Sequence, residues 1–133
     1  MTMQVELVAP EKILYSGDAD MVIARTTDGE IAFMSGHAPF IGSLGVGAVT
    51  IRASEGDDVL AAVHEGFVEV TDDRVTILSD VAELVDDIDA SRAQQALERA
   101  EQERGQVGDD EEAEREAEAA VRRAQLRVEL AEG

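Results

Sequence analysis

The chain has 133 residues, which suffices for one compact domain with an appended segment. Its 30 acidic side chains against 11 basic ones give a net charge of −19, so we expect it to bind neither nucleic acid nor anionic lipid headgroups. It has no cysteine, which excludes disulfide bonds and thiolate metal sites. We also expect no membrane insertion and no secretory signal, because no apolar run reaches about 18 residues and no basic stretch precedes an apolar block at the start.

The first part of the chain predicts short strands, because β-branched residues alternate with polar ones between glycine-containing turns. Ser16, Gly17 and Asp18 predict a turn, and the pair Asp72-Asp73 has the spacing of a tight hairpin. Strands at such short intervals favour an antiparallel β-sandwich or flattened barrel with an aliphatic core. The expected strands cover residues 4–9, 12–15, 21–25, 31–34, 46–53, 59–64, 67–71 and 74–79.

The composition changes near Leu84, after which alanine, glutamate and arginine dominate and apolar residues recur at helical spacing. Asp89 is the expected N-cap of a first helix. Gly105 and Gly108 bracket a break, and a second helix is expected to begin around residues 109–112, where acidic side chains suit the helix dipole.

These patterns predict two parts, a β domain over residues 1–85 and an antiparallel helical hairpin over residues 86–133. The second helix is expected to carry Arg122, Arg123 and Arg127 near its end, which is the favourable polarity for its dipole. The apolar stripes of the hairpin are rich in alanine and bury little area, so we expect it to detach easily from the β domain. The stripes are Ala93, Ala96, Leu97 and Ala100, and Ala113, Ala117, Val121, Ala124, Val128 and Ala131.

The sequence offers few candidates for catalytic residues or metal ligands. No metal site is expected, because His37 and His64 lie in separate segments without cysteine. His37 follows a glycine in a loop and is interpreted as a structural or contact residue, whereas His64 is interpreted as a surface or sheet-edge residue at a strand end. No nucleophile elbow, phosphate-binding loop or dinucleotide motif occurs, so we predict no catalytic residue. The acidic pairs are interpreted as solvated turn residues; they are Asp57-Asp58, Asp72-Asp73 and Asp86-Asp87.

Four segments resemble the epsilon subunits of F-type ATP synthases, in matching order and spacing along the whole chain. Three departures stand out: Ala32, Ser35 and Glu65 replace a glycine, a proline and a glycine of the family pattern. A glutamate takes a left-handed backbone conformation at a greater cost than a glycine does. The segments are GEIAFMSGHAPF at 29–40, GFVEV at 66–70 with VTILSDVAE at 75–83, IDASRA at 88–93, and Arg123-Ala124 with Arg127-Val128.

The resemblance implies a non-catalytic rotor subunit of the central stalk. In that role the β domain docks on the gamma subunit and the c-ring and couples rotation to the catalytic head. Glu30 and His37 match the family segment near this contact surface, although Glu30 can equally be an ordinary turn acid, and Phe40 is interpreted as a core aromatic. The complex would be peripheral at the cytoplasmic face of a bacterial plasma membrane, or at the stromal face of a thylakoid membrane.

The resemblance also implies that the hairpin regulates the complex. It would either fold on the β domain or extend along gamma to the catalytic alpha and beta subunits, where Arg123 and Arg127 meet acidic residues and ATP hydrolysis is inhibited. Local pairing of these arginines with neighbouring glutamates is the alternative role. No cofactor is implied beyond ATP as a regulatory ligand, which arginines from two helices can clamp. The candidate ATP-binding residues are Ile88, Asp89, Arg92, Ala93, Arg123 and Arg127, with Glu83 and Arg99 as weaker candidates.

Two other functions stay open from the residues alone. The chain could be a free-standing adaptor whose hairpin reaches into a partner protein, or an ATP sensor without a role in a rotor. Co-purification separates these alternatives, because only a rotor subunit should bring down gamma and the c-ring.

Overall fold

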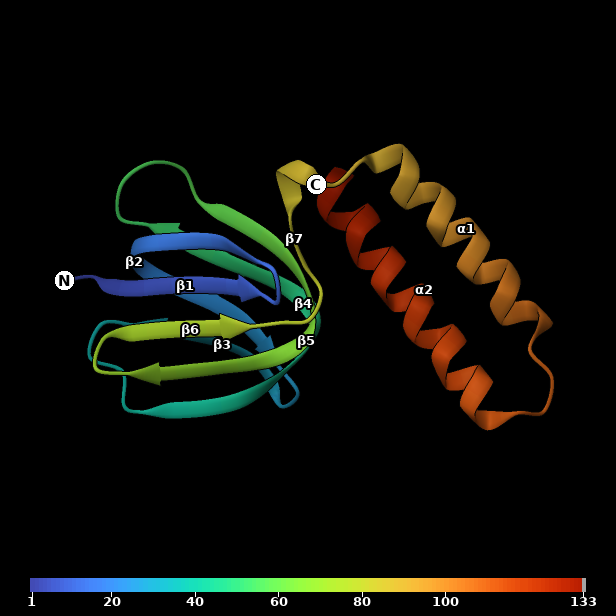
Figure 1. The fold of residues 1–133 in the computed structure, drawn as a ribbon, viewed down its shortest axis with the longest axis horizontal. Helices are drawn as coiled ribbons and strands as arrows, with labels where there is room; N and C mark the ends of the chain where they lie inside the picture. Colours follow the sequence, from blue (N-terminus) through green and yellow to red (C-terminus); the bar gives the residue numbers. More distant parts are fainter. Residues whose placement is uncertain (133) are drawn as a thin grey trace. The chain divides into compact units, whose positions relative to one another are not determined.

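The computed structural model describes residues 1–132, and the last residue of the predicted hairpin, Gly133, lies outside them. Two compact units divide the chain, one from Met1 to Leu84 and one from Val85 onward. The first contains the strands and the second contains the helices (Figure 1). Neither of the two long helices among the described residues has the apolar length that crossing a bilayer requires.

The first unit is a seven-stranded sheet that closes on itself. Its strands are β1 (Met3–Ala9), β2 (Lys12–Thr26), β3 (Gly29–Met34), β4 (Phe40–Ala53), β5 (Val59–Thr71), β6 (Arg74–Leu78) and β7 (Ala82–Leu84). The strand order is β1-β6-β5-β4-β2-β3, with β7 beside β5, and β1 also pairs with β2 and so closes the ring. Figure 1 shows β1 between β2 and β6. The predicted sandwich or flattened barrel is confirmed, although the β1–β6 pairing runs parallel.

The core of this unit is aliphatic, as the composition predicts, with Phe33 as its one fully buried aromatic ring among the described residues. Alternate residues of each strand point inward, so that β1 buries Met3, Val5 and Leu7 while the residues between them stay partly exposed. The other fully buried large side chains are Val22, Val49, Ile51, Val63, Val68, Val70, Val75 and Ile77.

The predicted turn at Ser16, Gly17 and Asp18 is wrong, because β2 runs through it without a break. These three residues pair with β1 in continuous antiparallel register, and this cross-strand pairing outweighs the local turn preference. The single tyrosine lies at the same place: the Tyr15 hydroxyl donates a hydrogen bond to the Asp18 carbonyl at 3.2 Å. Burial, and secondarily the charge of Asp18, raise the pKa of Tyr15 above its usual value of 10.0, so the phenol remains a donor at neutral pH.

β5 is also continuous where the sequence predicts two strands, 59–64 and 67–71. Glu65 and Gly66 have positive φ values of 69° and 152° inside it, yet β4 pairs with β5 on both sides of them. Glu65 therefore does take a left-handed conformation, at a position where the family pattern has glycine. β4 begins six residues earlier than predicted, at Phe40, and β7 has no counterpart among the predicted strands.

The predicted hairpin at Asp72-Asp73 is confirmed. Both residues have left-handed backbones, with φ values of 48° and 57°, between β5 and β6. Two consecutive left-handed residues are the mark of a type I′ turn, whose twist matches that of the flanking strands. Aspartate tolerates this conformation better than most side chains do.

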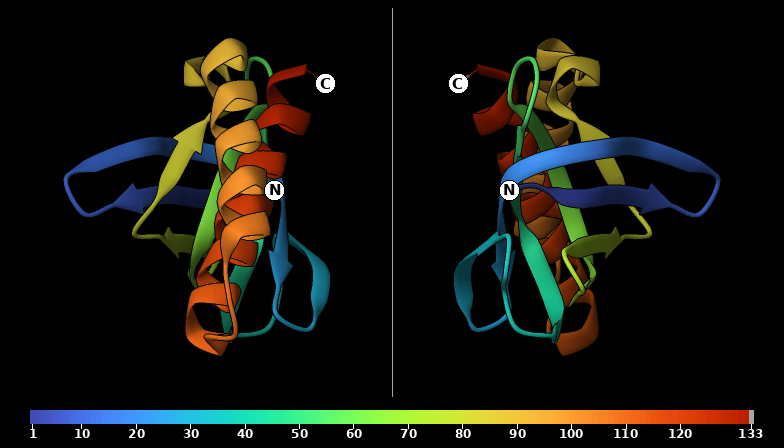
Figure 2. Two further views of the ribbon diagram at one scale, coloured as in Figure 1. Left: turned by 90° about the vertical axis from the view of Figure 1, so that its right-hand side faces the viewer. Right: turned by 90° about the vertical axis from the view of Figure 1, so that its left-hand side faces the viewer.

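The second unit begins with a short 3-10 helix, Val85–Asp87, followed by α1 (Ala90–Gln106) and α2 (Glu111–Glu132). The two helices lie side by side and are joined at one end (Figures 1 and 2). The prediction for Asp89 is confirmed, because its carboxylate accepts a hydrogen bond from the Arg92 amide at 3.1 Å and caps α1. Asp110 caps α2 in the same way, through the amides of Glu112 and Ala113.

The alanine seam of the hairpin follows the predicted stripes. Ala93 and Ala100 of α1 are buried, as are Val121 and Ala124 of α2. One detail is wrong: α2 continues to Glu132, so its last turn contains no basic residue and the arginines lie too far from its end to stabilise the dipole there.

Candidate functional site

The outer face of the barrel carries a row of apolar side chains. Phe67 of β5 lies opposite Leu78 of β6, Leu78 lies opposite Val8 of β1, and Val8 lies opposite Ile13 of β2. Opposed residues in neighbouring strands share a face of the sheet, so these four form one line across four strands. We call them the apolar row. Ile41 of β4 extends the row diagonally, because it pairs with the residue two positions beyond Phe67.

These side chains are exposed although they are large. The exposed fraction is 60% for Ile13, 57% for Phe67, 51% for Leu78 and 71% for Ile41, and Val8 is half-buried. The alternate residues on the inner face, such as Val68 and Ile77, are fully buried, so the row is not part of the core. A contiguous apolar surface on a rigid sheet is the usual mark of a protein-binding surface.

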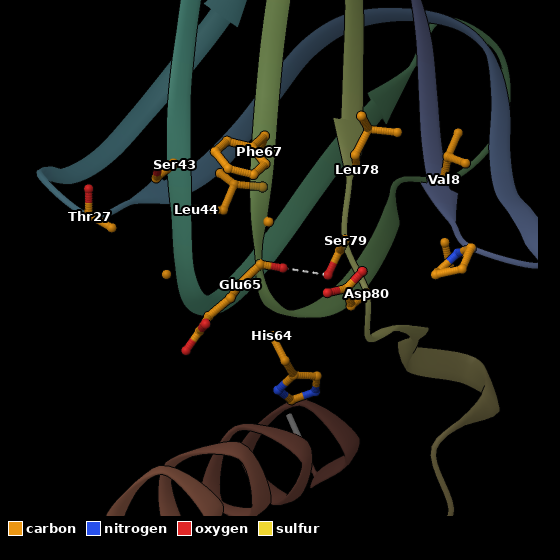
Figure 3. Close-up of a pocket in the computed structure, with 14 residues that line it drawn as sticks. Val8, Thr27, Ser43, Leu44, His64, Glu65, Phe67, Leu78, Ser79 and Asp80 are labelled. Atoms are coloured by element: carbon orange, nitrogen blue, oxygen red, sulfur yellow. Dashed lines mark hydrogen bonds between the residues drawn. The ribbon is translucent and has the colours of Figure 1, made fainter. Parts of the chain in front are cut away.

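A hollow of about 680 Å³ adjoins the apolar row. Figure 3 shows Phe67, Leu44, Leu78 and Val8 along one side of it. The opposite side carries polar groups, among them the exposed carboxylates of Glu65 and Asp80. The row and the hollow together offer a partner an apolar surface with an acidic border.

A close approach of two backbones shapes the hollow. Gly66 faces the end of β6 so tightly that a Cβ atom there would overlap the carbonyl oxygen of Leu78. The Ser79 hydroxyl, which is buried, donates to the Glu65 carbonyl at 2.6 Å and lies 2.9 Å from that of Val81. These contacts hold the bend of β5 against the chain that leaves β6.

The loop after β3 carries His37. Its ring is half-buried and meets Phe33 edge-on, with the ring centres 5.0 Å apart, and Phe40 at 6.2 Å. The Nδ1 atom of His37 lies 2.7 Å from the Ala38 carbonyl. Phe40 packs against the core, as expected.

Glu30, the other predicted rotor contact, is exposed and lies in β3 opposite Arg25. It is therefore a strand residue, one position past the turn. Glu30 and His37 are near opposite ends of β3, since each strand residue advances about 3.3 Å, so the structure does not bring the two side chains together.

His64 is not the sheet-edge residue that the sequence predicts. It lies inside the continuous β5 and is only 5% exposed, with β7 alongside. Its Nε2 atom lies 3.4 Å from the Glu83 carboxylate, and its amide donates to the Val81 carbonyl at 2.9 Å. The prediction is wrong because the strand does not end at this position.

The six candidate ATP-binding residues all belong to the second unit. Because α2 runs antiparallel to α1, the first turn of α1 lies beside the second half of α2 (Figure 1), which brings the two groups of candidates toward the same end of the hairpin. Ala93 is buried in the seam and the Asp89 carboxylate is engaged as a cap. The positive charge there comes from the exposed Arg92 and from the half-buried Arg123 and Arg127; Ile88 is half-buried.

The described residues contain no group of three or more histidine, aspartate or glutamate side chains placed to hold a metal ion. The arginines at the end of the hairpin fit a polyphosphate by charge, since guanidinium groups donate two parallel hydrogen bonds to phosphate oxygens. The Arg92 guanidinium makes no ion pair with any residue in the described part of the chain.

Comparison with known proteins agrees with the two-unit architecture. Residues 2–85 match the model of the ATP synthase delta/epsilon chain β-sandwich domain, and residues 86–132 match that of its long α-helix domain. Among solved structures, a chain of the mitochondrial ATP synthase of Euglena gracilis shares the fold with a TM-score of 0.84 at 22% identity, over 99% of this chain and 82% of that one.

Sequence relatives agree with the resemblance. The ATP synthase epsilon chain of Thermobifida fusca is 47% identical over 131 residues, covering 96% of this chain and 92% of that one. That of Streptomyces griseus is 52% identical over 98 residues, covering 74% and 79%. The family assignment that the four sequence motifs indicate is thereby confirmed: the chain belongs to the delta/epsilon chain family of ATP synthases.

Proposed function

We propose that the chain is a non-catalytic rotor subunit of an ATP synthase that couples c-ring rotation through gamma to the catalytic head. The observation that carries this proposal is the apolar row, together with Ile41, on a closed barrel. A closed barrel transmits force with little deformation, because every strand is tied to two neighbours or to the core. The row offers gamma the contiguous apolar anchors that stable interfaces need.

The His37 loop supplies the second contact of this proposal, with the c-ring. It lies between β3 and β4 and is bound by Asp73 next to the start of β6, whereas Leu78 of the apolar row lies at the end of β6. One barrel can therefore touch gamma through the row and the c-ring through the loop. Glu30 remains a candidate on the edge strand β3. The subunit would then be peripheral, at the cytoplasmic face of a bacterial plasma membrane or at the stromal face of a thylakoid membrane.

Affinity purification of the tagged chain from its source tests the proposal. Gamma and the c-ring subunit are expected in stoichiometric amounts in the eluate. An adaptor or a free ATP sensor would leave both behind, so their absence would refute the rotor role.

The hairpin is proposed as an inhibitor of ATP hydrolysis. Three of the four buried residues in its seam are alanines, which bury little area, so at about 25 cal/mol per Å2 the hairpin is only weakly stabilised. Arg123 and Arg127 lie one helical turn apart, and in an extended arrangement they would meet acidic residues of the catalytic subunits.

Removal of residues 86–133 is expected to raise ATP hydrolysis by the assembled enzyme while assembly stays intact, because the first unit has its own core. Hydrolysis is measured by phosphate release from the purified complex. Arg123→Ala with Arg127→Ala should reproduce part of the increase, and Arg122→Ala, an exposed neighbour, should not. An unchanged rate after the deletion would remove the inhibitory role.

ATP is proposed as a ligand at the end of the hairpin where the candidate residues meet. When bound it would supply the polyphosphate charge that Arg92, Arg123 and Arg127 neutralise. The net charge of −19 opposes an anion, but salt screens charges farther than about 10 Å, so only the nearby arginines decide the binding.

Calorimetric titration of the full chain with ATP is expected to show binding that Arg92→Ala weakens about 10- to 100-fold, the effect of losing one charge-assisted hydrogen bond. Arg115→Ala serves as the control, because that exposed arginine lies at the start of α2, far from Arg92 along the hairpin. An absence of heat with the unmodified chain would end the ATP proposal without touching the rotor role.

A further inference from the structure

Asp73, in the turn between β5 and β6, makes two contacts with distant parts of the barrel. Its carboxylate oxygen Oδ1 accepts a hydrogen bond from the Gly36 amide at 2.7 Å. Its backbone carbonyl accepts one from the Gln4 amide at 2.9 Å. One residue thereby joins the β5–β6 turn to the start of β1 and to the loop that carries His37.

The contact with Gly36 is the long-range anchor of the His37 loop. The other hydrogen bonds described for residues 35–39 are local: the His37 amide donates to the Met34 carbonyl at 3.1 Å, and the His37 ring lies 2.7 Å from the Ala38 carbonyl. Gly36 has a φ of 87°, so the loop turns sharply at the residue that Asp73 holds. A bond from an amide to a carboxylate is stronger than one to a neutral acceptor.

The turn itself does not require a carboxylate at this position. Asp73 has a left-handed backbone with a φ of 57°, which glycine adopts at a lower cost, and Asp-Gly is a preferred pair for a type I′ turn. Asp72 shares the left-handed conformation, with a φ of 48°, but is exposed, and no hydrogen bond of its side chain is described. The side chains of the two neighbours therefore differ in the hydrogen bond to Gly36, which only that of Asp73 makes.

We propose that Asp73 is a positioning residue, which fixes the His37 loop in the shape that contacts the rotor. This inference rests on the proposed contact of His37 with the c-ring. The carboxylate holds Gly36, Gly36 sets the direction of the loop, and the next residue, His37, packs its ring against Phe33 and Phe40.

The test compares Asp73→Gly with Asp72→Gly in the full chain. Both replacements suit the turn, so both variants should fold, and only Asp73→Gly loses the hydrogen bond to Gly36. Hydrogen exchange of the Gly36 amide, followed by NMR, is expected to accelerate about tenfold or more in Asp73→Gly and to stay unchanged in Asp72→Gly. Asp73→Asn, which keeps a carbonyl acceptor, should fall between them.

The functional arm measures the affinity of each variant for the gamma–c-ring complex, with His37→Ala as reference. Asp73→Gly is expected to weaken binding in the same direction as His37→Ala, whereas Asp72→Gly should bind normally. The proposal is overturned if Gly36 exchange does not change, or if His37→Ala weakens binding and Asp73→Gly does not. If His37→Ala also binds normally, the proposed contact of the loop fails, and this inference fails with it, while the docking of gamma on the apolar row stands.

Discussion

Gly66→Ala is expected to lower the free energy of unfolding of the β unit by about 2–6 kcal/mol. The added Cβ atom would overlap the Leu78 carbonyl oxygen and lie 3.0 Å from the Ser79 Cα atom. Both are backbone atoms, so no side-chain rotation relieves the overlap, and overpacking of this kind costs about 1–3 kcal/mol. The φ of 152° adds about 1–3 kcal/mol of backbone strain for a residue with a side chain. A small domain has only about 5–15 kcal/mol to lose.

Gly56→Ala is the matched control for this prediction. Gly56 also has a positive φ, 92°, but a Cβ atom there would meet nothing within 4 Å. Gly56→Ala should therefore lower the free energy of unfolding by only about 1–2 kcal/mol, the cost of an alanine in a left-handed conformation. Urea unfolding can be followed through the emission of Tyr15, because the chain has one tyrosine and no tryptophan. Equal losses in the two variants would contradict a tight approach of Gly66 to the Leu78 carbonyl.

Phe67→Glu is expected to weaken the binding of gamma by about 30- to 1,000-fold, the effect of losing an apolar anchor worth about 2–4 kcal/mol. Phe67 stands inside the apolar row, next to Leu78 and close to Ile41. A carboxylate there would lose its hydration on docking and would leave the apolar surface interrupted. The affinity can be measured by titrating purified gamma with the full-length chain.

Met34→Glu is the control for the docking prediction. Met34 is also a large exposed apolar residue, 53% exposed, but it lies on β3, outside the apolar row. It should keep normal affinity for gamma, and both variants should unfold at the urea concentration of the parent chain, since neither side chain is in the core. A Phe67→Glu chain that binds gamma normally would exclude the row as the docking surface.

Features that depend only on residues adjacent in the sequence could be predicted from it. The Asp89 cap requires only a short polar side chain before a helix, and the Asp72-Asp73 hairpin requires only two strands separated by two residues that tolerate left-handed backbones. The two-part organisation followed from a change in composition near Leu84.

Features that depend on the register between strands could not be predicted from the sequence. Alternation separates the inner from the outer residues of one strand, but Phe67 and Leu78 form a row with Val8 only because three strands align them. The predicted turn at Gly17 is wrong because the pairing of β2 with β1, which lies outside the local sequence, keeps this segment extended. Asp73 looked like a solvated turn residue, since the Gly36 amide that it holds comes from a loop far away in the sequence.

The parallel pairing of β1 with β6 has a consequence for synthesis of the chain. β1 can pair with β2 as soon as both have left the ribosome, but its other edge finds its partner only when β6 emerges, because Gln4 pairs with Arg74 and Val8 with Leu78. Translation at about 5–20 residues per second leaves that edge open for several seconds. An unpaired strand edge is a template for association with other chains. Stalled chains that end before Arg74 should therefore aggregate. Chains that extend beyond Leu78 can pair β1 with β6, so this strand edge is no longer open to other chains.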